Sequence, residues 1–271
     1  GITGTNGKTT TTSLTYDIMK RHAKKALLVG NIEIPYTGYA LESDKDSVTV
    51  AEISSFQLET MVTFKPHVTA ILNITPDHLD RHKTLENYIA IKESITKNQD
   101  ENDFCVLNYN DPVLREFGKT PRCKVIFFSS SEELESGVFL RGDTMIIKEN
   151  GVETPVCTTK DTSLVGMHNY ENIMAAIAMT HAMGVPLDTI RQGIKEFTAV
   201  EHRIEFVTEK NGVKYYNDSK GTNPDAAIKA VCAMPSPTIL IGGGYDKKSS
   251  YDEWVATFEG RVKELLLIGK T

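Results

Sequence analysis

A glycine-rich loop near the start of the chain constrains the fold more than any other feature. Residues 4–9 read Gly-Thr-Asn-Gly-Lys-Thr and run into a helical pattern from Thr9 to about Lys24. Loops of this composition join a buried strand to a helix in phosphate-binding α/β proteins. Strand and helix patterns alternate along the rest of the chain, so we predict an α/β fold with a mostly parallel sheet.

Two domains are expected from the order of these patterns. Strand-like segments at residues 26–29, 48–53 and 68–74 and a helix at about 169–183 come before a boundary near Ala199. The alternation then restarts and runs through a strand at 238–241 into three glycines. We predict a central P-loop-type domain over 1–198 and a smaller Rossmann-like α/β domain over 199–271. Because the chain opens inside a motif and stops just after a strand pattern, we expect an internal piece of a longer protein, with the second domain incomplete.

Composition excludes several classes of partner. The chain has 271 residues and a net charge of −6, which gives no basic surface for a nucleic-acid backbone or an anionic membrane. No apolar run approaches the roughly 20 residues needed to cross a bilayer. The four cysteines are widely spaced and typical of reduced thiols. We therefore expect a cytoplasmic protein that binds neither nucleic acid nor membrane. We also expect a monomer.

The loop residues have chemical roles that follow from their types. Glycines let backbone N–H groups close around phosphate oxygens, and the helix that follows adds positive potential. Lys8 would reach the β- and γ-phosphates, and the Thr9 hydroxyl would ligate Mg²⁺. The usual motif has a further glycine at the place of Ile2. The alternative is a glycine-rich turn that only starts a helix.

Polar residues follow two predicted strands. Glu52 ends an apolar strand, where P-loop enzymes hold a metal, although such an acid more often only solvates a strand end. His78, flanked by Asp77 and Asp80, follows another strand and is a candidate metal ligand at the sheet edge where α/β proteins bind ligands. Lys92 lies on a predicted amphipathic helix, and composition alone favours a surface lysine there.

Further candidates lie in the second half of the chain. Asn169 and Asn172 share one helix face and could bond a purine edge, although Asn169 could simply cap the helix. A Glu-His-Arg segment stands at the predicted boundary, at residues 201–203. Lys220 precedes a helix N-terminus, a combination that suits an anion, and Lys247 follows the glycine run at 242–244.

Taken together, these segments resemble the Mur ligases, the ATP-dependent amide-forming enzymes of peptidoglycan precursor synthesis. The resemblance covers essentially the whole chain, from residues 4–9 through 217–220 to 246–247. Residues 54–59, Ser-Ser-Phe-Gln-Leu-Glu, are similar to those of members that add D-glutamate to UDP-N-acetylmuramoyl-L-alanine. This implies that ATP phosphorylates the carboxylate of the UDP-linked L-alanine and that the amine of D-glutamate attacks the acyl phosphate.

The resemblance also implies roles for single residues. Those implied to contact ATP are Gly4, Thr5, Asn6, Gly7, Lys8, Thr9, Thr10, Asn169, Asn172, Arg203 and Asp218. Those implied to ligate two Mg²⁺ ions are Thr9, Glu52, His78 and Lys92, the last as a carbamate. Those implied at the acyl phosphate or D-glutamate are Asn31, Ser54, Lys220, Thr222 and Lys247. The implied catalytic set is Lys8, Glu52, His78, Lys92, His202 and Lys220.

Two departures from the family pattern stand out. Glu33 occupies a position that is usually glycine in the loop around Asn31. The family's N-terminal UDP-binding domain and the rest of its C-terminal domain are absent, so we expect nucleotide binding but poor turnover from this chain alone.

Three alternatives stay open. One is another ligase of the same group, such as a diamino-acid-adding or folylpolyglutamate ligase, against which residues 54–59 argue. A second is a nucleotide-binding module without ligase chemistry, which would have no use for Lys220 and Lys247. A third is a non-catalytic scaffold, which is hard to reconcile with intact Lys8, Glu52 and His78.

Overall fold

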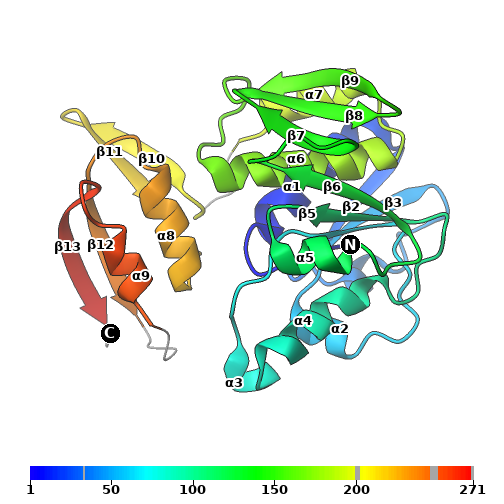
Figure 1. Ribbon diagram of the computed structural model, residues 1–271, viewed down its shortest axis with the longest axis horizontal. Coiled ribbons are helices and arrows are strands. Elements are labelled where there is room, and N and C mark those ends of the chain that lie inside the picture. Colours follow the sequence, from blue (N-terminus) through cyan, green and yellow to red (C-terminus); the bar gives the residue numbers. More distant parts are fainter. Residues whose placement is uncertain (33, 199–201, 245–249, 270–271) are drawn as a thin grey trace. The chain divides into compact units, whose positions relative to one another are not determined.

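The protein forms two compact units, which a computed structural model describes over residues 1–32, 34–198, 202–244 and 250–269 (Figure 1). The first unit comprises residues 1–164 and 169–198. The second comprises residues 165–168 and 199–271. The short segment at 165–168 therefore belongs to the second unit, although it lies within the sequence of the first. The predicted division of the chain at Ala199 stays a prediction.

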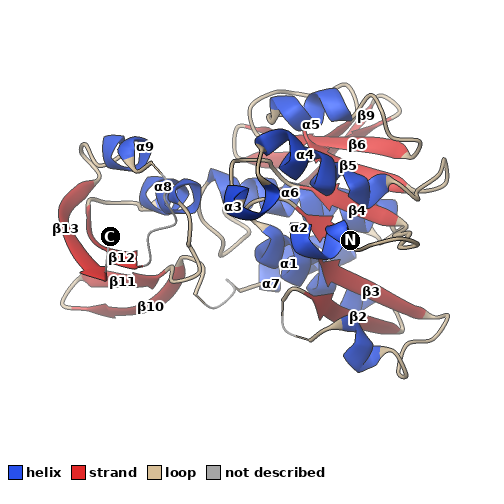
Figure 2. Ribbon diagram, turned by 90° about the horizontal axis from the view of Figure 1, so that it is seen from below, coloured by secondary structure: helices blue, strands red, loops and turns tan. Residues whose placement is uncertain are grey.

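One nine-stranded sheet organises the first unit, in the order β2-β3-β1-β4-β5-β6-β7-β8-β9. Neighbouring strands from β2 to β7 are parallel, and β7, β8 and β9 are joined antiparallel. Figure 2 shows β6, β5, β4, β3 and β2 one after another across the sheet. The strands are β1 Ile2–Thr3, β2 Lys25–Gly30, β3 Ser47–Glu52, β4 Val68–Ile71, β5 Phe104–Asn108, β6 Lys124–Ser129, β7 Gly137–Arg141, β8 Thr144–Glu149 and β9 Val152–Thr158. The predicted α/β fold with a mostly parallel sheet is confirmed.

The helices of the first unit pack on this sheet. They are α1 Lys8–His22, α2 Ser55–Glu59, α3 Leu79–His82, α4 Leu85–Glu93, α5 Pro112–Phe117, α6 Met167–Ala182 and α7 Leu187–Glu196, with 3₁₀ turns at Tyr36–Tyr39 and Ser94–Thr96. An apolar cluster joins α2, α4 and α5 to β4 and β5 through Leu58, Ile71, Tyr88, Leu107 and Leu114. On α1, basic residues fill the last turn, where they complement the helix dipole.

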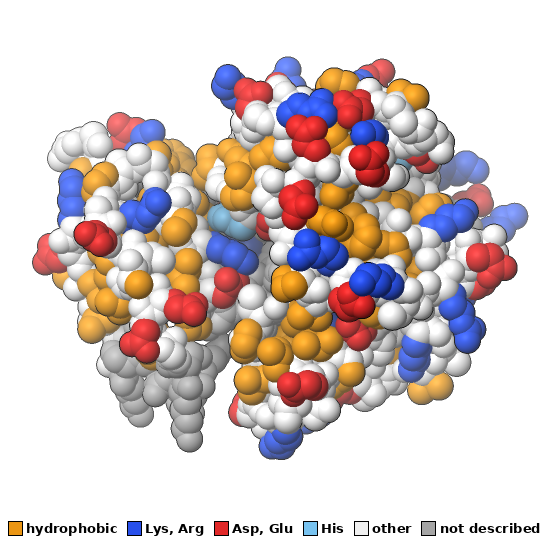
Figure 3. Space-filling model, in the orientation of Figure 1, with side chains coloured by type: hydrophobic (Ala, Val, Ile, Leu, Met, Phe, Trp, Pro, Cys, Tyr) orange, Lys and Arg blue, Asp and Glu red, His pale blue; other side chains and the backbone are white. Residues whose placement is uncertain are grey.

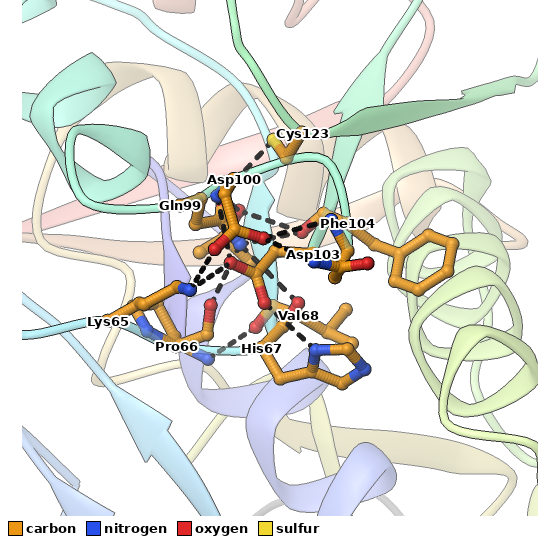
Figure 4. Close-up of polar contacts among 12 residues, drawn as sticks. Lys65, Pro66, His67, Val68, Gln99, Asp100, Asp103, Phe104 and Cys123 are labelled. Atoms are coloured by element: carbon orange, nitrogen blue, oxygen red, sulfur yellow. Dashed lines mark hydrogen bonds and ion pairs between the residues drawn. The ribbon is translucent and has the colours of Figure 1, made fainter.

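A polar network fixes the edge at which β4, β5 and β6 begin (Figure 4). The Asp103 carboxylate accepts a hydrogen bond from the backbone N–H of Asp100 at 2.9 Å, and it pairs with His67 Nδ1 at 3.0 Å and Lys65 Nζ at 3.3 Å. The carbonyl of Asp103 accepts from the N–H of Lys124 at 2.9 Å. These contacts hold the amino ends of the strands together, and the carboxyl ends lie at the opposite edge.

From residue 202 onward, the described part of the second unit contains two strand pairs and two helices. β10 (Glu205–Lys210) and β11 (Val213–Asn217) form a hairpin through Asn211 and Gly212, both with positive φ, as an Asn-Gly turn requires. β12 (Thr238–Gly244) and β13 (Val262–Gly269) are parallel. Helix α8 (Pro224–Ala233) is capped by Asn223, whose side chain accepts from the N–H of Ala226 at 2.8 Å, and α9 spans Asp252–Ala256.

Charged side chains of both signs are mixed on the surface. Basic and acidic side chains are interspersed on the face of the first unit drawn in Figure 3. Among the described residues, no helix combines the length and apolar character needed to cross a membrane.

Candidate functional site

The glycine-rich loop lies between β1 and α1, as the sequence predicts. Gly4 has φ 137° and Gly7 has φ 85°, in the region that favours glycine. A Cβ on Gly7 would lie 2.2 Å from Asn172 Oδ1, so a side chain there would also clash. The loop opens the 15-residue helix α1, whose first backbone N–H groups and dipole favour an anion. Thr9 and Thr10 are buried in its first turn.

The end of β4 holds the loop in place. The backbone N–H of Thr5 donates to the carbonyl of Asn73 at 2.9 Å. The Asn73 side chain accepts from the N–H of Asn6 at 2.8 Å and donates to the carbonyl of Asn6 at 3.0 Å. The Thr5 hydroxyl bonds the Thr75 carbonyl at 3.0 Å and lies 3.1 Å from the Tyr88 hydroxyl. Asn73 and Tyr88 are therefore part of the site, and sequence reasoning assigned neither.

Two lysines meet at one carbonyl of the loop. Lys8 Nζ donates to the carbonyl oxygens of Gly4 at 3.0 Å and Thr5 at 2.8 Å. Lys92 Nζ donates to the same Gly4 oxygen at 2.9 Å. Burial, helped by the charge of Lys8, lowers the pKa of Lys92 well below 10.5. The side chain is 1% exposed, so the surface role that composition favours for Lys92 is wrong.

Glu52 ends β3, directly beside β1, with which it is in register at Ile2. The residue is 2% exposed. Its Oε1 accepts from Asn31 Nδ2 at 2.9 Å, and its Oε2 is buried with no hydrogen-bond partner in the described structure. An unsatisfied buried acceptor costs about 1–3 kcal/mol, and more when charged, so this oxygen fits a cation. The charge of Glu52 acts on Lys92, as does that of Asp77.

His78 lies at the start of α3 with φ 53°, and its ring is half exposed. Its Nε2 is 3.6 Å from Asp77 Oδ2. Across the part of the chain that the structure describes, no group of three or more His, Cys, Asp and Glu side chains is arranged to hold a metal. The assignment of Thr9, Glu52, His78 and Lys92 as ligands of two Mg²⁺ ions stays a prediction.

Ser54 and the α6 asparagines have partners within the protein. Ser54 caps α2: its hydroxyl accepts from the N–H of Gln57 at 3.3 Å, and the Gln57 side chain accepts from the N–H of Ser54 at 2.9 Å. Asn172 Nδ2 donates to Asn169 Oδ1 at 3.3 Å, and Asn172 Oδ1 accepts from the Thr11 hydroxyl at 3.3 Å. Because α6 begins at Met167, Asn169 lies inside it, and the capping alternative for Asn169 is wrong.

Comparison with known proteins decides the family. Residues 2–180 match the Mur ligase middle domain. The chain belongs to the Mur ligase family. A UDP-N-acetylmuramoylalanine--D-glutamate ligase from Lachnoclostridium phytofermentans is 54% identical over 270 residues, which are 100% of this chain and 60% of that protein. A relative of the same name from a Thermoanaerobacter species is 50% identical with the same coverage. The chain thus spans about 60% of the length of these curated relatives.

Solved Mur ligase structures share the fold. MurF from Acinetobacter baumannii superposes with a TM-score of 0.74 at 19% identity, over 98% of this chain and 66% of that one. MurF from Thermotoga maritima, solved in complex with ADP, gives a TM-score of 0.72 at 20% identity, over 100% of this chain and 70% of that one. The predicted resemblance to the Mur ligases is confirmed.

The remaining predicted residues of this Mur ligase lie in the second unit, where two motifs meet. His202 Nδ1 lies 2.8 Å from Asn217 Nδ2, and its carbonyl accepts from the N–H of Lys220 at 3.1 Å. Asp218 Oδ1 accepts from the N–H of Ile204 at 3.1 Å, and burial raises the pKa of Asp218. His202 and Ile204, the neighbours of Arg203 in sequence, therefore contact residues 217–220. Thr222 is exposed, and Lys247 and Glu33 lie outside the described residues.

Proposed function

We propose that this chain is the nucleotide-binding part of an ATP-dependent ligase that adds D-glutamate to UDP-N-acetylmuramoyl-L-alanine. One observation carries the proposal: a buried carboxylate with an unpartnered oxygen, Glu52, ends the strand beside the phosphate loop. Relatives that are 50% and 54% identical over the whole chain bear the name of this reaction. Those relatives are named for D-glutamate addition, and this similarity supports the same substrates here.

The residues of the site fit Mg²⁺. The free Oε2 of Glu52 is a carboxylate donor of the kind that Mg²⁺ prefers. We assign Thr9 and Glu52 to one ion, and His78 and a carbamylated Lys92 to a second. Bound Mg²⁺ would neutralise phosphate charge during phosphoryl transfer. Carbamylation requires an unprotonated amine, which adds CO₂ and releases one proton. Burial lowers the pKa of Lys92 and so favours that amine.

The proposed reaction has two steps. The carboxylate of the UDP-linked L-alanine displaces ADP from the γ-phosphorus and becomes an acyl phosphate, whose leaving group is better than that of a carboxylate. The amine of D-glutamate then attacks the acyl carbon, and phosphate leaves. Lys8 would stabilise charge on the phosphates. Asn31 and Ser54 would lie near the acyl phosphate, and Asn169 and Asn172 near the adenine.

The second unit would supply the remaining contacts. We assign Arg203 and Asp218 to the nucleotide and His202 to the vicinity of the substrate. We assign Lys220, Thr222 and Lys247 to D-glutamate or the transferring phosphate. We place the protein in the cytoplasm as a monomer. Its free cysteines suit a reducing compartment, and sedimentation tests the oligomeric state.

The proposal is tested by phosphate release from ATP with UDP-N-acetylmuramoyl-L-alanine and D-glutamate. The protein should be extended to the length of its relatives, since this chain alone is expected to bind MgATP and turn over poorly. Release with D-glutamate, none with L-glutamate, and a loss of roughly 10- to 100-fold in ATP affinity for Lys8→Ala are expected. Equal release with both enantiomers would overturn the stereospecific assignment, and release with diaminopimelate or a folate would assign another ligase of this group. MgATP binding without substrate-dependent release would favour a nucleotide-binding module.

A further inference from the structure

A serine, a histidine and a glutamate form a chain of polar contacts between α2 and α3, in which Ser55 and His82 are buried and Glu59 is exposed. Ser55 Oγ lies 3.0 Å from His82 Nε2. His82 Nδ1 lies 3.1 Å from Glu59 Oε1, an ion-pair distance without the alignment of a good hydrogen bond. Arg81 holds the other oxygen of Glu59 at 2.7 Å. With its Nδ1 proton toward Glu59, the ring can accept the Ser55 hydroxyl proton at Nε2.

Burial excludes a nucleophilic role for this Ser-His-Glu chain. Ser55 is 4% exposed and the His82 side chain is 0% exposed, so a substrate carbonyl has no access to the hydroxyl. A catalytic serine must come within hydrogen-bond reach of both its base and its substrate. The three side chains therefore have a structural role rather than a role in attacking a substrate.

The Ser-His-Glu contacts fix the helical turn that carries His78. The N–H of His82 donates to the carbonyl of His78 at 3.0 Å, so the two residues begin and end one helical turn. That turn stands between two residues in positive-φ conformations, His78 at 53° and Lys83 at 72°. Such conformations cost energy in residues other than glycine and persist only when the surroundings fix them. An anchored His82 supplies that constraint.

The His82 ring contacts two further aromatic rings. The His82 ring lies 5.5 Å from the Phe56 ring and 5.3 Å from the Tyr88 ring, centre to centre. Phe56 lies 5.0 Å from the His78 ring. The Tyr88 hydroxyl reaches Thr5 of the phosphate loop at 3.1 Å. His82 is thus packed between a side chain that touches His78 and one that touches the loop.

We propose that His82, held by Ser55 and Glu59, is a positioning residue that orients His78 for metal binding beside the phosphate loop. The inference rests on the proposed function, because it takes His78 to be a Mg²⁺ ligand. Outer partners of metal ligands fix ring orientation in this way, and their removal typically weakens metal binding 10- to 100-fold. Here the partner acts through one helical turn and through the Phe56 ring.

The test compares Mn²⁺ binding to the ATP complex, followed by electron paramagnetic resonance, with thermal unfolding of the metal-free protein. His82→Phe keeps an aromatic ring and removes both nitrogens. Ser55→Ala is the milder variant if His82→Phe does not fold, and Ser55→Thr keeps a hydroxyl. We expect about tenfold weaker Mn²⁺ binding for His82→Phe and Ser55→Ala, recovery with Ser55→Thr, and unchanged metal-free ATP affinity.

The matched control is His67→Phe at the opposite edge of the sheet, where His67 also pairs with a carboxylate, that of Asp103. It should lower the unfolding temperature without changing Mn²⁺ affinity. If His82→Phe behaves like this control, with Mn²⁺ affinity within about twofold of the parent, His82 is only a packing residue and the proposal is overturned.

If His78→Ala itself leaves Mn²⁺ binding intact, the metal role of His78 fails, and that pattern identifies the proposed function as the error. If His78→Ala weakens binding and His82→Phe adds nothing further to it, the two act together as proposed.

Discussion

Lys8 and Lys92 donate hydrogen bonds to one carbonyl oxygen, that of Gly4, at 3.0 and 2.9 Å. Two ammonium groups on one acceptor repel each other, and Lys92 is the more buried of the two. The charge of Lys8 adds to burial in lowering the pKa of Lys92. The glycine-rich loop thereby brings Lys8 and a buried lysine of lowered pKa to the same carbonyl oxygen.

The first prediction concerns pH and Lys92. Its pKa is lowered in the folded state from 10.5, so the unfolded chain binds the extra proton between the two values. The free energy of unfolding should therefore rise with pH through that window, by up to about 1.4 kcal/mol per pH unit from this group. Lys92→Met should remove that slope. Urea unfolding of both proteins from pH 7 to 10 in CO₂-free buffer measures the difference, and parallel curves would contradict the prediction.

The second prediction concerns the unpartnered oxygen of Glu52. Glu52→Gln removes a buried charge and keeps the Asn31 contact, so the metal-free protein should be as stable as the parent or about 1 kcal/mol more stable. The same change should weaken MgATP binding roughly tenfold or more while leaving metal-free ATP affinity unchanged. Calorimetric titration with and without Mg²⁺ separates the two effects. Equal losses under both conditions would argue that Glu52 contacts the nucleotide rather than the metal.

A third expectation follows from His168 in the second unit. Burial lowers the pKa of His168 from 6.5 to about 4. The unfolded state takes up a proton first as pH falls, so stability present above pH 6.5 is lost progressively between pH 6.5 and 4. The loss should be on the order of 2 kcal/mol, allowing for partial exposure, and His168→Gln should flatten it. Urea unfolding of the parent and of His168→Gln between pH 7 and 4 measures this difference.

Gly7 gives the fourth prediction. An alanine there would be strained at φ 85° and would place its Cβ 2.2 Å from Asn172 Oδ1. Gly7→Ala should cost about 1–3 kcal/mol of stability and weaken ATP binding. Gly151→Ala separates the causes, because Gly151 has φ 79° with no atom within 4 Å of the added Cβ. Adding Asn172→Ala to Gly7→Ala should restore the part that comes from the clash. No recovery would mean that backbone strain alone accounts for the loss.

The residues at the strand ends of this site could be predicted from the sequence. The side chains that pack around those strand ends could not. The loop, Glu52 and the region of His78 could be predicted because each follows a strand, and strand ends of a parallel sheet meet at one edge. The burial of Lys92 could not, since an amphipathic helix does not reveal which polar residue faces the core. His82 was missed for a similar reason. Its partner Ser55 is 27 residues away in sequence, and only the packing of α3 against α2 brings them together.

Local hydrogen bonding also changes what single residues can be expected to do. Ser54 and Asn172 were assigned by resemblance to ligand contacts, yet one caps α2 and the other supports the first turn of α1. Such intramolecular partners must be exchanged or shared when a ligand binds. The type and position of a residue therefore predict that it lies near a binding site. They do not predict whether its side chain already has a hydrogen-bond partner within the protein.

The assignment of residues 165–168 to the second unit bears on how this protein can be taken apart. A Cβ on Gly166 would lie 2.9 Å from that of Ala233, so this turn is closely packed on α8. A polypeptide ending at Thr198 would keep the turn and lose the surface that covers it. A separable first unit would therefore need a redesigned start to α6.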